Sequence, residues 1–215
     1  MSFPYSLAVF DLDGTLVDSA SDIAEAVNRT LEQWSLPRVE EVVIRGWIGE
    51  GAKLLLQRAL RHAGSALDVE EVFPSLAVHY GDCLLLDPQV YPGVRETLDA
   101  LRDAGVGLAI CTNKPERFVR PLLEYLSLGD YFTCIVGGDT LPERKPSAVP
   151  LLHVVNHFGL RVSQCLMVGD SETDLETAQA AAMPVALVSY GYLRGFDPHS
   201  VPGVIVVDDM RELLQ

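Results

Sequence analysis

The sequence predicts an α/β fold: a parallel sheet with helices on both faces and an inserted helical subdomain. Six short apolar runs have the length and composition of buried strands, and helix-like segments separate most of them. Residues 19–90 break this alternation, because they contain amphipathic helical patterns and no clear buried strand. These observations predict a core formed by residues 1–18 and 91–215, with residues 19–90 as the inserted subdomain.

The elements of the core follow one another in a strand–helix order. The predicted strands are 7–11, 107–112, 133–137, 165–169, 184–189 and 204–208. The predicted helices are 92–105, 115–126, 146–158 and 172–182, the first with Pro92 in its first turn and Gly105 at its end. In such parallel sheets the ligand crevice lies outside the carboxyl ends of the strands.

The inserted subdomain shows helical periodicity. Ile23, Val27, Leu31 and Trp34 fall on one stripe of a helix that Ser19 or Ser21 could cap. A second helix is expected around residues 54–62, and one or two more over residues 69–86.

Composition narrows the class of partner. The formal net charge of −14 argues against nucleic acid or an anionic membrane as partner. Apart from the charge, we expect a small metabolite as the ligand, and a monomer or a homodimer. The four cysteines are widely spaced and predict buried free thiols: Cys83, Cys111, Cys134 and Cys165. With no leader-like or membrane-spanning apolar stretch, we expect a cytoplasmic protein.

Two carboxylates end the first strand. Asp11 and Asp13 follow the apolar run Leu7–Phe10, and Gly14 permits a tight turn directly after them. Alternate residues of a strand share a face, so both side chains would point the same way if the strand continued. Because two crowded carboxylates repel each other unless a cation or a proton intervenes, the pair suggests metal-assisted chemistry.

Polar residues follow other strands of the same sheet. Thr112-Asn113-Lys114 ends the second strand, and Gly169-Asp170 ends a later one, followed by Ser171 and Asp174. Lys145 precedes the helix that leads into that later strand. The set gathers several carboxylates, hydroxyl or amide donors and a lysine at one crevice. Hard oxygen ligands of this kind suit Mg²⁺.

These motifs resemble those of the haloacid-dehalogenase (HAD) superfamily of phosphohydrolases. Four segments match the four motifs of this superfamily in order: Asp11-Leu-Asp-Gly-Thr-Leu-Val-Asp18, Thr112, Lys145 and Gly169-Asp170-Ser-Glu-Thr-Asp174. The resemblance covers essentially the whole chain, and four ordered motifs are far more specific than one. It implies a Rossmann-like HAD core with an inserted α-helical cap.

The resemblance also implies a mechanism. Asp11 would attack phosphorus to form an aspartyl-phosphate, and Asp13 would act as general acid and then general base. Mg²⁺ would be held by Asp11, the backbone carbonyl of Asp13 and Asp170, with Asp174 in or behind the coordination shell.

A separate set of groups is expected to stabilise the negative charge on the phosphoryl oxygens during transfer. The resemblance implies that Thr112, Lys145 and backbone amides near Asn113 and Leu12 would stabilise it. The implied phosphate-binding residues are therefore Thr112 and Asn113, with Lys145 counted among the catalytic residues.

Three segments look most like phosphoglycolate phosphatases within the superfamily: residues 45–51, residues 135–139 and residues 190–192. Arg45 in the first could bind the carboxylate of 2-phosphoglycolate bidentately. The alternative is that Arg45 and Trp47 anchor a loop of the cap. Two departures stand out: related sequences often carry Asn and Asp where Glu50 and Lys53 stand, and proline at Ala148.

Other functions compete with hydrolysis of 2-phosphoglycolate to glycolate. A phosphatase of another small sugar phosphate, or a β-phosphoglucomutase-like phosphotransferase, would use the same acids. A phospho-accepting signalling receiver would be shorter and uncapped, with its acceptor on a middle strand, whereas Asp11 follows the first strand. A silent binding module would not need the full set of acids.

Overall fold

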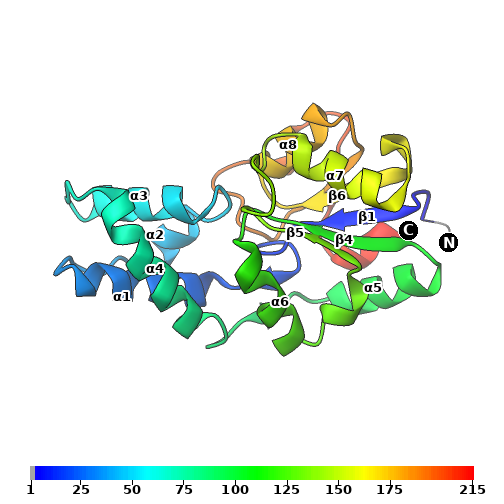
Figure 1. Cartoon of the computed structure of the whole chain (residues 1–215). Helices are drawn as coiled ribbons and strands as arrows, with labels where there is room; N and C mark the ends of the chain where they lie inside the picture. Colours follow the sequence, from blue (N-terminus) through cyan, green and yellow to red (C-terminus); the bar gives the residue numbers. More distant parts are fainter. Residues whose placement is uncertain (1–2) are drawn as a thin grey trace.

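The computed structural model describes residues 3–215 and contains the predicted parallel sheet (Figure 1). Its six strands lie in the order β5-β4-β1-β6-β7-β8, and every neighbouring pair is parallel. Their bounds are Leu7–Phe10 for β1, Gly107–Cys111 for β4, Cys134–Val136 for β5, Cys165–Gly169 for β6, Val185–Val188 for β7 and Ile205–Val207 for β8. Each bound lies within one residue of the predicted strand.

The central strand β1 is buried on both faces. Ala8 and Phe10 join one hydrophobic cluster, whereas Leu7 and Val9 join a second cluster on the opposite face. This arrangement explains why the strand is a continuous apolar run in the sequence.

Four helices cover the two faces of this sheet (Figure 1). On one face lie α5 (Val94–Asp103) and α6 (Glu116–Tyr125), and on the other α7 (Val149–Phe158) and α8 (Glu172–Ala180). Four short 3₁₀ turns complete the core: Gly129–Tyr131, Val162–Gln164, Pro198–Ser200 and Met210–Leu214. Pro92 lies before α5 and not in its first turn, because Gly93 caps that helix in a left-handed conformation with φ of 79°.

The remaining helices lie to one side of the sheet, at the left of Figure 1. They are α1 (Ala20–Gln33), α2 (Glu41–Arg45), α3 (Ala52–His62) and α4 (Val69–Cys83), called the helical insert below. The chain leaves the core through β2 (Val17–Asp18) and returns through β3 (Gln89–Val90), and these two short strands pair antiparallel. The sequence pattern gives no indication of this ribbon.

The four cysteines are buried free thiols, as predicted. Among residues 3–215, no helix has both the length and the apolar character that crossing a membrane requires.

Candidate active site

A cavity lies where the helical insert meets the carboxyl ends of β1 and β4. From the core it is lined by the predicted residues Asp11, Asp13, Thr112 and Asn113, and also by Lys114. The insert contributes mainly apolar side chains: Ile23, Ile48, Ala52, Leu55, Phe73, Leu76 and Ala77. The cavity is therefore polar on the core side and apolar on the insert side.

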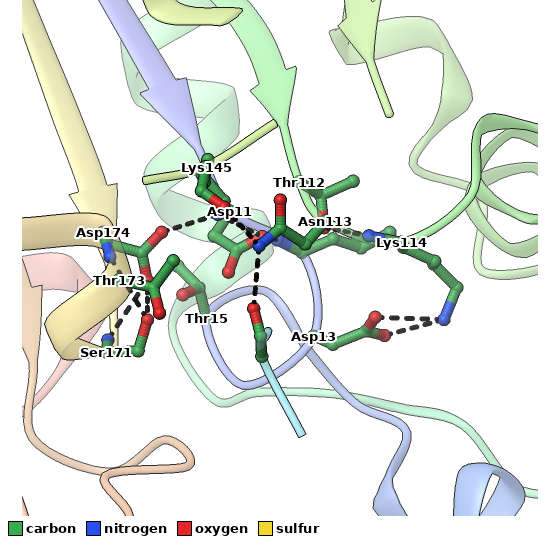
Figure 2. Close-up of polar contacts among 12 residues, drawn as sticks. Asp11, Asp13, Thr15, Thr112, Asn113, Lys114, Lys145, Ser171, Thr173 and Asp174 are labelled. Carbon is green, nitrogen blue, oxygen red and sulfur yellow. Dashed lines mark hydrogen bonds and ion pairs between the residues drawn. The ribbon is translucent and has the colours of Figure 1, made fainter. Parts of the chain in front are cut away.

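Lys145 joins two of the predicted carboxylates at this edge (Figure 2). Its buried Nζ lies 2.6 Å from Asp174 Oδ1 and 3.0 Å from Asp11 Oδ1. Leu12 N also donates to Asp11 Oδ1, at 2.8 Å, so this amide is already engaged by the nucleophile candidate. The lysine offsets part of the negative charge that the acids bring into the protein interior.

Asp11, Asp170 and Asp174 form a buried acidic cluster whose ligand oxygens lie within 4.8 Å of one another. Burial and the nearby Asp174 raise the pKa of Asp11 to about 6, although Lys145 lowers it. Burial, together with Asp174 and Asp11, also raises the pKa of Asp170 well above its usual range. Three desolvated hard oxygen donors that repel one another fit a divalent cation such as Mg²⁺.

The acids of the cluster are held by neighbouring donors. Asp174 Oδ2 accepts from the backbone of Asp170 and Ser171 and from Ser171 Oγ, the last at 2.6 Å. Asp170 accepts from Thr15 Oγ1 at 2.9 Å and from Tyr192 N at 2.6 Å. With Lys145 on Asp174 Oδ1, both oxygens of Asp174 and both oxygens of Asp170 have protein partners that fix their positions.

Asp13 lies apart from this cluster and contacts a different lysine (Figure 2). Its two carboxylate oxygens lie 2.9 Å and 3.1 Å from Lys114 Nζ. Ser19 occupies the cap position of α1, but its hydroxyl donates to Asp13 Oδ1 at 2.6 Å and makes no capping bond. The two strand-end aspartates thus line one cavity and have different cations as partners.

Thr112 and Asn113 connect the site to its surroundings. A hydrogen bond from Thr112 contributes to lowering the pKa of Asp11, against the larger effect of burial. Asn113 Nδ2 donates to the carbonyls of Lys145 and Gly49, each at 3.1 Å. Asn113 therefore links the core loop that contains Lys145 to the helical insert.

Arg45 does not line the cavity. Its Nη2 donates to both carboxylate oxygens of Asp18, at 3.0 Å and 2.7 Å, and its guanidinium lies 5.0 Å from the ring centre of Tyr192. In this arrangement Arg45 ties the insert to the ribbon strand β2, which is the contact that the anchoring alternative describes; a role of Arg45 in substrate binding stays a prediction.

A second ion pair joins the insert to the core at Glu50. Arg58 of the insert and Arg194 of the core each place a nitrogen 2.5 Å from Glu50 Oε2. Burial raises the pKa of Glu50, but the two arginines together lower it by more than burial raises it. The pKa of Glu50 therefore lies below its usual value. The carboxylate is therefore held in its charged form between two cations.

Sequence reasoning missed several of these residues. Lys114 and Thr15 lie inside the quoted motif segments, and that position was the available signal, but neither was predicted to have a role. No motif adjacency pointed to two further contacts. These are the bond that the Tyr80 hydroxyl of α4 accepts from Lys114 Nζ, and the Glu50–Arg194 ion pair. These contacts join residues remote in sequence, and only the docking of the insert brings them together.

Comparison with known proteins places the chain in a family. The model of the haloacid dehalogenase-like hydrolases matches residues 8–188. The chain belongs to the haloacid dehalogenase-like hydrolase family. This membership confirms the resemblance drawn from the four motifs.

Individual relatives agree with the family. The chain is 44% identical over 215 residues to phosphoglycolate phosphatase 1 of Pseudomonas aeruginosa, and 42% identical over 216 residues to a phosphoglycolate phosphatase of Pseudomonas putida. Both alignments cover 97% of this chain and 78% of the relative. A crystal structure of a predicted phosphoglycolate phosphatase from Haemophilus somnus superposes with a TM-score of 0.91 at 36% identity, covering 100% of this chain and 98% of that one.

Family and relatives together identify the chain as an enzyme that hydrolyses phosphoric monoesters. Members of this family generally use a divalent metal, and the acidic cluster of Asp11, Asp170 and Asp174 offers suitable ligands.

Proposed function

We propose that the enzyme is a Mg²⁺-dependent phosphatase that converts 2-phosphoglycolate to glycolate through a phosphorylated Asp11. The observation that carries the proposal is the position of Lys145, which contacts Asp11 and Asp174 within the acidic cluster. This arrangement stabilises a buried nucleophile next to the ligand set that a divalent cation requires. The names of the relatives support the substrate.

The proposed roles of the strand-end acids are those that the resemblance to the family implies. Asp11 forms a bond to phosphorus as the ester P–O bond breaks, and Asp13 gives a proton to the departing oxygen. A water then attacks phosphorus and gives its proton to Asp13, and inorganic phosphate leaves Asp11. Splitting the reaction in this way lets one carboxylate act as nucleophile while the other manages the proton.

Several groups are available for the charge on the phosphoryl oxygens. Lys145 and Thr112 lie beside Asp11, and Asn113 lines the same cavity. Asp11, Asp170 and the backbone carbonyl of Asp13 would hold Mg²⁺, with Asp174 supporting them. The bound ion would supply positive charge that offsets the repulsion between Asp11 and the phosphate.

We further propose that residues 19–90 act as a cap over residues 1–18 and 91–215. The cavity supports this division, because the polar groups on its core side face apolar side chains of the insert. Docking the insert against the core excludes water from the cavity, which favours transfer to Asp11 before hydrolysis.

A substrate panel tests the proposal. We expect kcat/KM for 2-phosphoglycolate to exceed that for ethyl phosphate, 3-phosphoglycerate, ribose 5-phosphate and glucose 6-phosphate by at least about tenfold, the difference that a lost charge-assisted contact produces. EDTA should abolish phosphate release, and added Mg²⁺ should restore it. Asp11→Asn, which removes the nucleophile with little change in shape, should be inactive.

The outcomes separate the parts of the proposal. A preference for another phosphate ester would reject the substrate and keep the reaction. Phosphate moved between hydroxyls of glucose 1-phosphate, with none released, would favour the phosphotransferase. Near-native activity of Asp11→Asn would reject the aspartyl-phosphate.

A further inference from the structure

Lys114 is a buried cation to which the proposed reaction assigns no role. Its side chain is 1% exposed, and Nζ lies 2.9 Å from Asp13 Oδ1 and 3.1 Å from Asp13 Oδ2. The Tyr80 hydroxyl also accepts from it, and the Tyr80 ring centre lies 4.7 Å away. Tyr80 comes from α4, so a residue of the helical insert helps to hold a cation of the core.

Such a site is costly to build. An ammonium group loses its hydration on burial and is tolerated only where oxygen partners replace the water. Asp13 and Tyr80 both line the same cavity as Lys114, so the cation is held at the wall where a ligand would enter.

The position of Lys114 assigns it to one end of the substrate. Lys145 contacts Asp11, the residue that receives the phosphoryl group, whereas Lys114 contacts Asp13, the residue that protonates the departing oxygen. The proton donor must lie within hydrogen-bond reach of that oxygen. Lys114 contacts that proton donor, so it lies on the leaving-group side of the site, one contact beyond Asp13.

The chemistry of 2-phosphoglycolate fits this separation of the two lysines. A single methylene group joins the ester oxygen to the carboxylate, so the anionic group of the leaving molecule lies close to the proton donor. Arg45, the other candidate for this carboxylate, is paired with Asp18 outside the cavity. The insert-side wall is largely apolar and offers the carboxylate few partners.

We infer that Lys114, held in place by Tyr80, binds the carboxylate of the leaving group and thereby selects a substrate that is anionic at both ends. The inference rests on the proposed function, because it assigns a recognition role within that reaction. Lys145 then serves the phosphoryl end and Lys114 the carboxylate end.

A second cation of the cavity provides a matched control. Arg117 lines the cavity from the first turn of α6 but is exposed and lies over the ring of Phe118, 4.6 Å from its centre. Replacing it by methionine removes one positive charge from the same cavity without disturbing the contact with Asp13. It therefore separates a specific contact from a general electrostatic effect.

The experiment compares two esters that differ only at the leaving group, 2-phosphoglycolate and ethyl phosphate. For Lys114→Met we expect the ratio of their kcat/KM values to fall by about 10- to 100-fold, as for the loss of a charge-assisted hydrogen bond. Arg117→Met should lower both values by the same factor. Tyr80→Phe keeps Lys114 but removes the hydroxyl that holds it in place. This variant should lower the ratio less than Lys114→Met does, mainly because KM for 2-phosphoglycolate rises.

Equal losses on both esters in Lys114→Met would overturn the inference, because Lys114 would then act only through Asp13. If Lys114→Met fails to fold by circular dichroism, Tyr80→Phe decides, and an unchanged ratio in that variant rejects the inference. The wild-type ratio tests the proposed substrate separately: without a preference for 2-phosphoglycolate, the proposed function fails whatever the variants do.

Discussion

At the scale of single residues, Asp11 combines two conflicting requirements. In the proposed reaction it must be charged to attack phosphorus, yet burial and Asp174 raise its pKa to about 6 even with Lys145 at 3.0 Å. Lys145 alone therefore does not bring the pKa of this carboxylate back to its usual value. The remaining stabilisation of the charged form is what a divalent cation would provide.

This balance predicts how Mg²⁺ and pH act together on stability. The pKa of Asp11 lies above its unfolded value of 3.8, so in metal-free protein its contribution is most favourable at low pH and is lost as pH rises through about 6. Mg²⁺ binds the ionised form, so its stabilising effect should appear over the same range. We expect the Mg²⁺-induced rise in Tm to be large at pH 7.5 and small at pH 5.

Thermal melts with Mg²⁺ or EDTA between pH 5 and 8 would check this prediction. Asp11→Asn is the control, because it removes one of the two cluster carboxyls whose pKa is raised, the other being Asp170, and should therefore reduce the pH dependence. A Mg²⁺-induced shift of equal size at pH 5 and 7.5 in the wild-type protein would contradict it.

The site residues were predictable where a motif carries them. Asp11, Asp170 and Asp174 follow or flank apolar strands, so their proximity could be inferred from the convergence of strand ends. Arg45 was not predictable in this way, because its partner Asp18 lies 27 residues away and the sequence does not show which charges meet.

At the scale of elements, the turn after β1 positions a ligand of the proposed metal site. Gly14 adopts φ of +91°, and a Cβ placed there would lie 2.3 Å from Asp170 Oδ2. The turn from β1 and the end of β6 therefore approach so closely that only glycine fits between them.

Gly14→Ala should displace Asp170 and weaken Mg²⁺ binding by about 10- to 100-fold, the range found when groups supporting metal ligands are altered. Calorimetric titration with Mg²⁺ would measure the loss. Gly105→Ala is the matched control, because Gly105 also has a positive φ, +76°, but nothing lies within 4 Å of an added Cβ. Equal Mg²⁺ affinity in the two variants would refute the steric argument.

Some strands and helix bounds could be predicted from the sequence, and others could not. The six strands of the sheet were predictable because each is an apolar run, and all but the edge strand β8, where Ile205 is exposed, are largely buried. The ribbon of β2 and β3 was not, because strands of two residues are too short to show periodicity. The start of α5 moved past Pro92 because the left-handed Gly93 serves as its cap.

At the scale of the whole molecule, a few polar contacts hold the helical insert against the core. Glu50 contacts Arg194 across the interface at 2.5 Å, and Asn113 reaches the carbonyl of Gly49 at 3.1 Å. Tyr80 adds its contact with Lys114. These interactions were beyond sequence analysis, since the pattern predicts helices but not how two subdomains dock.

The Glu50 contact predicts a defect in closure. Glu50→Gln should raise KM about fivefold with little change in kcat, because a partly exposed ion pair contributes about 1 kcal/mol. Steady-state kinetics would measure the change, and small-angle scattering would detect a more open average shape.

Glu70→Gln is the matched control for this experiment. Glu70 makes the same kind of ion pair, with Lys53 at 2.8 Å, but both partners belong to the insert. If Glu50→Gln and Glu70→Gln have the same KM, the Glu50–Arg194 pair does not hold the insert closed.

The central claim is that phosphate passes through Asp11 on its way to water. The stereochemistry at phosphorus tests it directly, using a substrate made chiral at phosphorus with oxygen isotopes and sulfur, hydrolysed in isotopically labelled water. Two successive in-line displacements, first by Asp11 and then by water, predict net retention of configuration. Net inversion would mean that water attacks the substrate directly, and would contradict the account.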